Sequence, residues 1–582
     1  MSRDLFKGKR RLPFCLACFV SSPARRGRAL GDHRMIFRNI SHRQFLSGFG
    51  QGIAFLLLIL TLGLFGLHRI NFVTADLGRH IENGEIFLKE GRIVSTNYYS
   101  FTEPDRPVIN HHWGAGVIFY LLWRQFDFKG LSYFYTAIFL VSFLLFFSVA
   151  KDISGFSLAY FFSILSLPLI VSRPELRPEG LSYLFLAIFV FFLHRYKTGR
   201  VKPEYLAFLI LIQIAWVNTH IFFFLGPLVI SFFLLEAWCQ KREKKDIRNL
   251  FILLGAALVA CWINPFGIEG ALSPFTILKE YGYMLAENQS VPFMQKRFSE
   301  NPVYLHFEII FAVMLVGFVI VVRKKNVHWY ILNILLLGFV SVLAWKAVRA
   351  LVLFGFLFIP FTSGIYADGI KRFSHKTRQV SRSAVFLLGV LIIIFGLISR
   401  NFYYSPYRTL GLSFLIEGIE KSPFWMADLI RRRNQLPGLV PGVNRSAEFF
   451  NKLHIEGPVF NNYDIGGYLI FHLFPRHKVF VDNRPEAYSV SFFKDVYVPM
   501  QEDEAVWAEM LKRHSFNAIY FFRQDMTPWA QPFLIRRIQD PEWAPVFVDY
   551  YTLILLRRNQ RNKDIIRRYE LPRSIFKITS QG

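Results

Sequence analysis

The sequence contains little cysteine, with four residues among 582. Cys15 and Cys18 form a single C-x-x-C, but no second pair completes a zinc site and no βαβ pattern surrounds it as in a redox motif. The chain also lacks the internal repeat that transporters commonly show. These absences count against a zinc-binding or thiol-redox protein and make a transporter the weaker alternative.

Charged residues are also scarce, at 19%, whereas 53% of the chain is hydrophobic and 65 residues are phenylalanine. About 20 apolar residues span the core of a bilayer, and runs such as "IAFLLLILTLGLFGL" supply that pattern repeatedly. The predicted spans are 49–68, 131–150, 155–171, 179–194, 203–217, 220–238, 249–263, 305–322, 328–345, 349–367 and 384–402. The sequence therefore predicts a polytopic α-helical membrane protein with about eleven transmembrane helices.

The formal charge of +27 would suggest a nucleic-acid partner in a soluble chain. In a membrane protein this excess is expected in cytoplasmic loops, and Lys and Arg do gather in residues 1–48, in "RYKTGRVK" and in "KREKKDIR". The loop 69–130 holds as many acidic as basic residues, which places it outside. We therefore expect a multi-pass protein of the plasma (inner) membrane with a cytoplasmic N-terminus, in contact with membrane lipids and not with nucleic acid.

The predicted organisation has three parts. These are a basic cytoplasmic segment 1–48, a membrane domain 49–402 with a large first outer loop 69–130, and an extracytoplasmic α/β domain 403–582. Residues 1–34 are interpreted as an overlong start or a cytoplasmic tail. The apolar run after Trp113 is too short to cross, so it predicts an amphipathic helix at the outer surface. In the last domain, "YLIFHLF", "KVFVD", "NAIYFF" and "YYTLILL" predict strands, and "EDEAVWAEMLKRH" predicts a helix.

With this topology, unusual polar residues fall on one face of the membrane. They are Asp76, His80, His111, His112, Arg173, Arg177, His220, Lys346 and Arg349. Polar groups near the hydrocarbon boundary are costly and usually face a cavity or a partner. The alternatives are snorkelling of the basic side chains to lipid headgroups, a cap or surface role for Asp76, and a core position for the His111–His112 pair. The pattern predicts a single outward-facing site.

The order of these motifs resembles that of the GT-C superfamily of polytopic glycosyltransferases, and most closely an uncharacterised bacterial group with a C-terminal soluble domain. The matching stretches are Asp76, His80, Gly84-Glu85, "GRIVSTNYYSFT", His111-His112-Trp113, "RPE", "WVNTH", "NPFG" and "VFNNYDIGGYLIFHLFPRHKVFVDNRPEAY". Together they cover about residues 49–558.

The resemblance implies transfer of a sugar from a polyprenyl-phosphate carrier to a glycan, lipid or protein acceptor on the outer face, with inversion at the anomeric carbon. It makes Asp76 the general base, with His80 as a second catalytic candidate. Basic residues, or a divalent metal, would stabilise the departing lipid phosphate. The candidates for binding the substrate or its phosphate are His111, His112, Arg173, Arg177, His220, Lys346 and Arg349.

The sequence departs from the family pattern at three places. Asn97 and His112 stand where the family has carboxylates, and Arg79 replaces a tryptophan. The missing carboxylates weaken the case for bound Mg²⁺ and favour imidazole as the second functional group, so no cofactor is assigned and a divalent metal stays an alternative. A catalytically silent membrane assembly protein of the same fold, or a lipid or glycan transporter, are the other functions that the sequence leaves open.

Overall fold

The computed structural model describes residues 42–67, 69–173, 175–276, 281–299, 301–322, 327–371, 374–398 and 437–576. The chain divides into two compact units, Met1–Gln51 and Gly52–Gly582, and helix α1 (His42–Gly66) contains the boundary. The predictions for residues 1–34, for the Cys15–Cys18 pair and for 403–436 lie outside the described residues.

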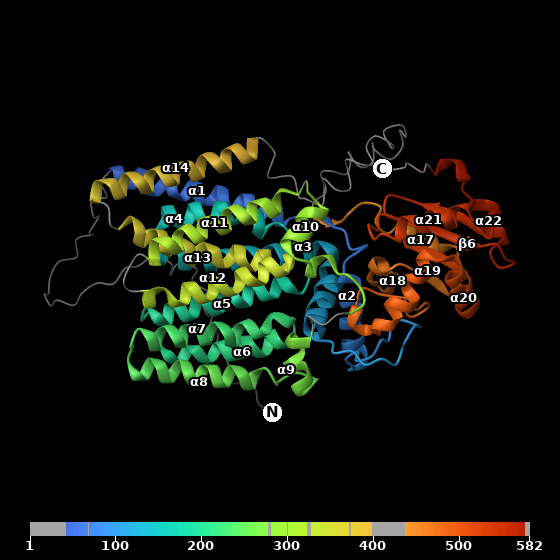
Figure 1. The fold of residues 1–582 in the computed structure, drawn as a ribbon, viewed down its shortest axis with the longest axis horizontal. Helices are drawn as coiled ribbons and strands as arrows, with labels where there is room; N and C mark the ends of the chain where they lie inside the picture. Colours follow the sequence, from blue (N-terminus) through green and yellow to red (C-terminus); the bar gives the residue numbers. More distant parts are fainter. Residues whose placement is uncertain are drawn as a thin grey trace, which may run out of the picture. The chain divides into compact units, whose positions relative to one another are not determined.

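The second unit contains a bundle of long apolar helices (Figure 1). After α1 they are α3 (Trp113–Ser154), α4 (Phe156–Ile170), α5 (Glu179–Lys197), α6 (Ala207–Val217), α7 (Leu225–Cys239), α8 (Lys244–Ala260), α11 (Pro302–Val322), α12 (Ile331–Lys346), α13 (Leu351–Ile370) and α14 (His375–Ile398). Each predicted span falls on one of these helices. Within the described ranges, seven helices are long and apolar enough to cross a membrane, and three shorter apolar helices accompany them. The chain is a multi-pass membrane protein.

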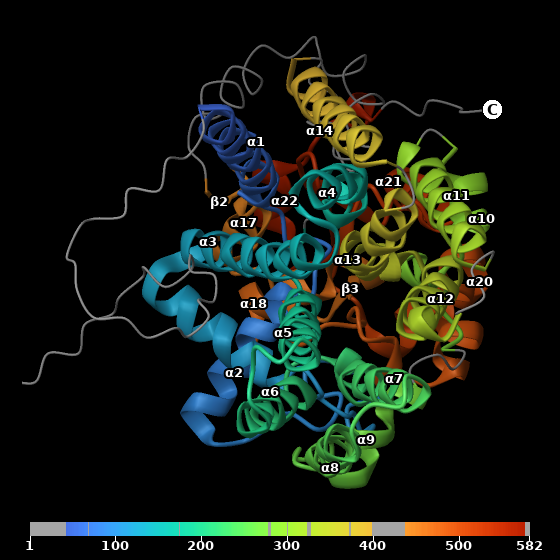
Figure 2. The same ribbon diagram turned by 90° about the vertical axis from the view of Figure 1, so that its left-hand side faces the viewer.

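Helix α13 is the centre of this bundle. Figure 2 shows it surrounded by α3, α4, α11 and α12, and it contacts all four. Its residues from Leu351 to Ile365 are buried on every face, and Phe356 packs on Phe146 of α3 with ring centroids 5.3 Å apart. A helix that is apolar all round can face lipid or other helices, and the contacts of α13 show that it packs among helices.

The first outer loop contains helix α2 (Leu77–Glu90), which ends at Gly91 in the left-handed conformation. Helix α2 packs on the first part of α3, and a Cβ at Gly84 would overlap the carbonyl oxygen of Gly116. The run after Trp113 is helical, as predicted. It continues into the next span through a kink at Asp127, where φ is 55°, so both lie within the single element α3.

The described part of the C-terminal domain is built on a four-stranded sheet of order β3-β4-β6-β5. Its strands are β3 (Val459–Asn461), β4 (Ala518–Phe522), β5 (Trp543–Val548) and β6 (Thr552–Arg557), and only β3 and β4 are parallel. The helices are α17 (Arg445–Lys452), α18 (Gly466–Leu473), α19 (Pro499–Glu502), α20 (Glu504–His514), α21 (Ala530–Gln539) and α22 (Lys563–Tyr569). Strands β4 and β6 and helix α20 confirm three of the predicted elements.

Two strand predictions in this domain are wrong. "YLIFHLF" lies mostly in helix α18, because a short apolar run fits a buried helix as well as a buried strand. Its packing decides the outcome: a Cβ at Gly78 of α2 would overlap the carbonyl oxygen of Gly467, so the two helices touch through their glycines. "KVFVD" forms only an isolated bridge, between Val479 and Ser100 of the first outer loop.

The first outer loop and the C-terminal domain are joined along their length. Strand β1 (Arg69–Ile70) pairs in parallel with β2 (Gly438–Leu439). Ser100 Oγ donates to the carbonyl oxygen of Phe480 at 2.9 Å, and Ser489 donates to the Glu103 carboxylate from both its backbone N–H, at 2.7 Å, and its hydroxyl, at 2.6 Å. The loop and the domain therefore lie on the same side of the membrane helices.

Candidate active site

A cavity of about 370 Å³ lies where the first outer loop, the ends of the membrane helices and the C-terminal domain meet. Eight of the predicted residues line it: Asp76, His80, His111, His112, Arg173, Arg177, His220 and Arg349. They come from the first outer loop and from the α4–α5, α6–α7 and α12–α13 junctions. Lys346 does not line the cavity. It is exposed at the end of α12, because the chain turns into an extended conformation at Ala347 before Arg349.

Asp76 stands immediately before α2, and its carbonyl oxygen accepts the backbone N–H of His80 at 3.0 Å. The helix thus places His80 one turn beyond Asp76. The Asp76 carboxylate lies 3.6 Å from the Arg79 guanidinium. Burial raises the pKa of Asp76, against the opposing charges of Arg79 and Arg177. An aspartate with a raised pKa is a stronger base when it is ionised.

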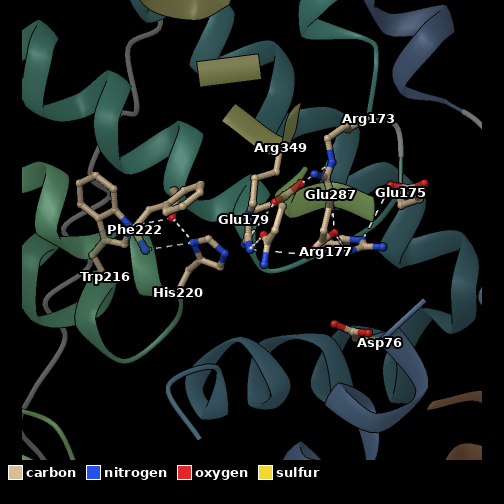
Figure 3. A network of polar contacts seen from close by, with 12 residues as sticks. Asp76, Arg173, Glu175, Arg177, Glu179, Trp216, His220, Phe222, Glu287 and Arg349 are labelled. Atoms are coloured by element: carbon tan, nitrogen blue, oxygen red, sulfur yellow. Dashed lines mark hydrogen bonds and ion pairs between the residues drawn. The ribbon is translucent and has the colours of Figure 1, made fainter. Parts of the chain in front are cut away.

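Three arginines converge on one carboxylate, that of Glu287 (Figure 3). Arg173 and Arg177 donate to Glu287 Oε2 at 2.8 Å and 2.5 Å, and Arg349 Nη1 lies 3.5 Å from Oε1. Burial opposes ionisation of Glu287, but the three guanidinium groups hold its pKa below its ordinary value. The cluster is therefore ionised at neutral pH.

Further contacts hold the guanidinium groups in place. Glu179, in the first turn of α5, lies 3.2 Å from Arg173 Nε and 4.0 Å from Arg349 Nη2. Arg349 also donates to Asn288 Oδ1 at 3.2 Å and lies over the ring of Phe222. An anion that enters this cluster meets guanidinium groups already oriented by protein carboxylates.

Sequence reasoning missed Glu287. It lies in a short 3₁₀ turn, η3 (Ala286–Asn288), between helices α9 (Gly267–Thr276) and α10 (Val291–Arg297). No apolar period or motif marks this stretch. Its one signal was its place in the loop after the seventh predicted span, on the face where the other polar residues gather.

The histidines form a second wall of the cavity. His111 and His112 lie in the first outer loop directly before α3. The next residue, Trp113, donates its indole N–H to Asn218 Oδ1 at 2.9 Å, which ties this loop to the α6–α7 junction. Burial lowers the pKa of His80, His112 and His220 well below its ordinary value, and that of His111 to about 4. All four imidazoles are thus neutral at pH 7.

The C-terminal domain supplies the remaining wall, with Tyr463, Asp464, Asn483, Pro485 and Glu486. Burial, with a contribution from Asp525, raises the pKa of Asp464 to about 8, and burial also raises the pKa of Glu486. These residues were not among the predicted site residues. They lie in "NNYDIGG" and "DNRPEAY", within the longest stretch that matches the GT-C pattern, and that stretch could have pointed to them.

The residues do not fit a carboxylate-bound divalent metal. Over the described part of the chain, no group of three or more His, Cys, Asp or Glu side chains is arranged to hold a metal ion. Asn97, at the position of a family carboxylate, does not line the cavity. Its side chain is fully buried, accepts from Arg484 Nη2 at 2.9 Å and donates to the carbonyl oxygen of Thr102.

No protein-family model and no curated protein matches the chain. Among solved structures, it is similar to the oligosaccharyltransferase of Archaeoglobus fulgidus in the apo form, with 10% identity, a TM-score of 0.47, and coverage of 80% of this chain and 69% of that one. It is also similar to ArnT from Cupriavidus metallidurans, in the apo state (14% identity) and bound to undecaprenyl phosphate (12%), each with a TM-score of 0.44 and coverage of 88% of this chain and 98% of that one. Identities and TM-scores this low do not transfer an activity.

Proposed function

We propose that the chain is a GT-C-type membrane glycosyltransferase that moves a sugar from a polyprenyl-phosphate carrier to an acceptor on the outer face of the membrane. The observation that carries this proposal is the opposition, across one cavity, of a carboxylate with a raised pKa and a cluster of three arginines. A base and an anion site are the two groups that displacement of a sugar phosphate requires.

In the proposed reaction, the acceptor hydroxyl enters beside Asp76, which takes its proton. The acceptor oxygen attacks the anomeric carbon from the face opposite the phosphate, which gives inversion. The bond between that carbon and the phosphate oxygen breaks, and its electron pair stays on the leaving polyprenyl phosphate. Arg173, Arg177 and Arg349 stabilise the charge that this phosphate gains, because paired guanidinium groups suit phosphate oxygens.

A binding and transfer assay with the full chain in lipid nanodiscs tests the function. We expect binding of undecaprenyl phosphate, and release of that product when an undecaprenyl-phosphate hexose or pentose is supplied with envelope glycan or lipid acceptors. Arg177→Gln should weaken binding of undecaprenyl phosphate by about tenfold or more, the usual effect of losing a charge-assisted hydrogen bond. Arg106→Gln, at an exposed position in the first outer loop, is the matched control.

Absence of both binding and release in the unaltered chain would contradict the proposal and favour the silent assembly protein. Movement of the lipid across the bilayer without release of product would favour the transporter.

We also propose that the cavity faces the outside and the N-terminus the cytoplasm. Helix α5 starts at the cavity with Glu179 and ends about 27 Å away at Lys197, by its rise of 1.5 Å per residue. Basic residues gather at this far end, where Asp152 pairs with Arg195 and Arg200. The positive-inside rule makes that end cytoplasmic.

Cysteine labelling in intact cells tests this orientation. A cysteine at Met526, which is exposed in the C-terminal domain, should react with an impermeant maleimide before lysis, and a cysteine at exposed Lys245 should react only afterwards. The reverse pattern would overturn the orientation without touching the proposed chemistry.

A further inference from the structure

Four histidines lie in contact on one side of the cavity. The ring centroid of His112 is 5.2 Å from that of His80, 4.0 Å from that of His111 and 5.3 Å from that of His220. The four come from three separate places: the first turn of α2, the segment before α3 and the α6–α7 junction. They all line the cavity. Folding has thus gathered imidazoles that the sequence keeps apart.

Much of the hydrogen-bonding capacity of this group is unused by the described residues. His80 is 1% exposed, and neither of its ring nitrogens has a hydrogen-bond partner there. His111 Nδ1 lies 3.2 Å from the carbonyl oxygen of Ile109, while its Nε2 has no partner among those residues. Buried polar groups are normally satisfied, so these nitrogens indicate a ligand that completes them.

Hydrogen bonds on the side away from the cavity orient the fourth histidine, His220. Trp216 Nε1 donates to Ser182 Oγ at 2.7 Å, and Ser182 lies 2.8 Å from His220 Nδ1. The backbone N–H of Phe222 also donates to this nitrogen, at 3.3 Å. With Nδ1 accepting, the proton of the neutral ring resides on Nε2. In Figure 3, Arg349 and Glu179 lie between His220 on one side and Arg173 and Arg177 on the other, so the two walls meet at Arg349.

A wall of this kind suits one ligand chemistry. Neutral imidazole offers one donor and one acceptor, and a hydroxyl group offers the complementary pair. Phosphate oxygens only accept, and they are better served by the arginines.

We infer that His80, His111, His112 and His220 form the subsite that binds the hydroxyl groups of the transferred sugar. The inference rests on the proposed function and deepens it. It gives the arginine wall to the phosphate and the histidine wall to the sugar, where the sequence left both sets of residues as candidates for the substrate or its phosphate. His80 then acts by binding and orienting the sugar beside Asp76.

Equilibrium binding to the full chain in nanodiscs tests this division. The probes are undecaprenyl-phosphate glucose and undecaprenyl methyl phosphate, a phosphodiester of the same charge that serves as the bare carrier. We expect the glucosyl carrier to bind about tenfold or more tighter than the bare carrier, as two or more net hydrogen bonds would give.

His80→Phe and His112→Phe keep the ring volume and remove the nitrogens. Both variants should remove the extra affinity that the sugar gives to the glucosyl carrier, and leave the affinity for the bare carrier unchanged. Arg177→Gln should instead lower the affinity for both carriers by the same factor. His80→Gln, which restores a donor and an acceptor, should recover part of the extra affinity for the glucosyl carrier. His112 is less buried than His80, so its substitution disturbs the fold less. If His80→Phe does not fold, His112→Phe still tests the inference. His375→Phe, at an exposed position at the start of α14, is the control.

Equal binding of the glucosyl and bare carriers by the unaltered chain would overturn the inference and leave the proposed function standing. So would a parallel loss of affinity for both carriers in His80→Phe. Absence of binding by both probes would overturn the proposed function itself.

Discussion

Replacement of Asp76 by asparagine is expected to lower the rate of sugar transfer by at least about 10²-fold, the lower end of what a general base contributes. Asparagine keeps the size of the side chain and an oxygen that can face Arg79, but it cannot take a proton. Burial raises the pKa of Asp76, so the ionised form costs more in the folded chain than in the unfolded one. The variant should therefore be no less stable than the parent at pH 7, and thermal unfolding in nanodiscs checks this.

The pH profile separates a base from a residue that only shapes the cavity. In the unaltered chain the rate should rise with pH as Asp76 loses its proton, at a pH above that of an ordinary aspartate. Asp76→Asn should lose this acidic limb, while Asp105→Asn, an exposed aspartate of the same loop, should retain both rate and profile. Full activity in Asp76→Asn would remove Asp76 from the mechanism.

Replacement of Glu287 by glutamine is expected to make the folded chain depend on a bound anion. Removing one partner of a buried ion pair leaves uncompensated charge and costs about 3 kcal/mol or more. In this variant Arg173, Arg177 and Arg349 would face one another without the carboxylate that they share. Undecaprenyl phosphate should supply the missing negative charge, so it should raise the unfolding temperature of Glu287→Gln more than that of the parent.

Affinity gives the second result for this variant. If phosphate and the Glu287 carboxylate compete for the same guanidinium groups, Glu287→Gln should bind undecaprenyl phosphate about tenfold tighter, which corresponds to about 1.4 kcal/mol. Glu269→Gln, at an exposed position in α9, is the control. Weaker binding in Glu287→Gln would mean that the carboxylate holds the arginines in place and does not compete with the ligand.

Hydropathy located the membrane helices because each span is a local property of about 20 residues. The wrong or missing secondary-structure predictions lie in the C-terminal domain, where contacts between residues far apart in the sequence determine the local structure. The run 468–474 became a helix through its packing on α2. Strand β5 was missed because Pro545 weakens a strand pattern, and it lies at the edge of the sheet, where proline is tolerated. Strand β3 has three residues, too few for a period to be visible.

The candidate site, too, was predictable only in those parts that depend on local sequence. Residue type and loop position were enough to place Asp76, Arg177, His220 and Arg349 on one face, and the structure gathers them around one cavity. The same criteria could not separate Lys346 from Arg349, because one extended residue decides which of them turns inward. The partnership of Glu287 with arginines more than 60 residues away could not be inferred either, since it depends entirely on the tertiary fold.

The joint between the first outer loop and the C-terminal domain has a consequence for biosynthesis. Glu103 and Ser489 are 386 residues apart, so at about 5 to 20 residues per second the ribosome needs roughly 20 to 80 seconds to make the second after the first. During that interval ten predicted spans are made, while the first loop lacks its partner domain. Asp464 and Glu486, which complete the cavity, are also late products. A chain released early would insert into the membrane with an open, unfinished site.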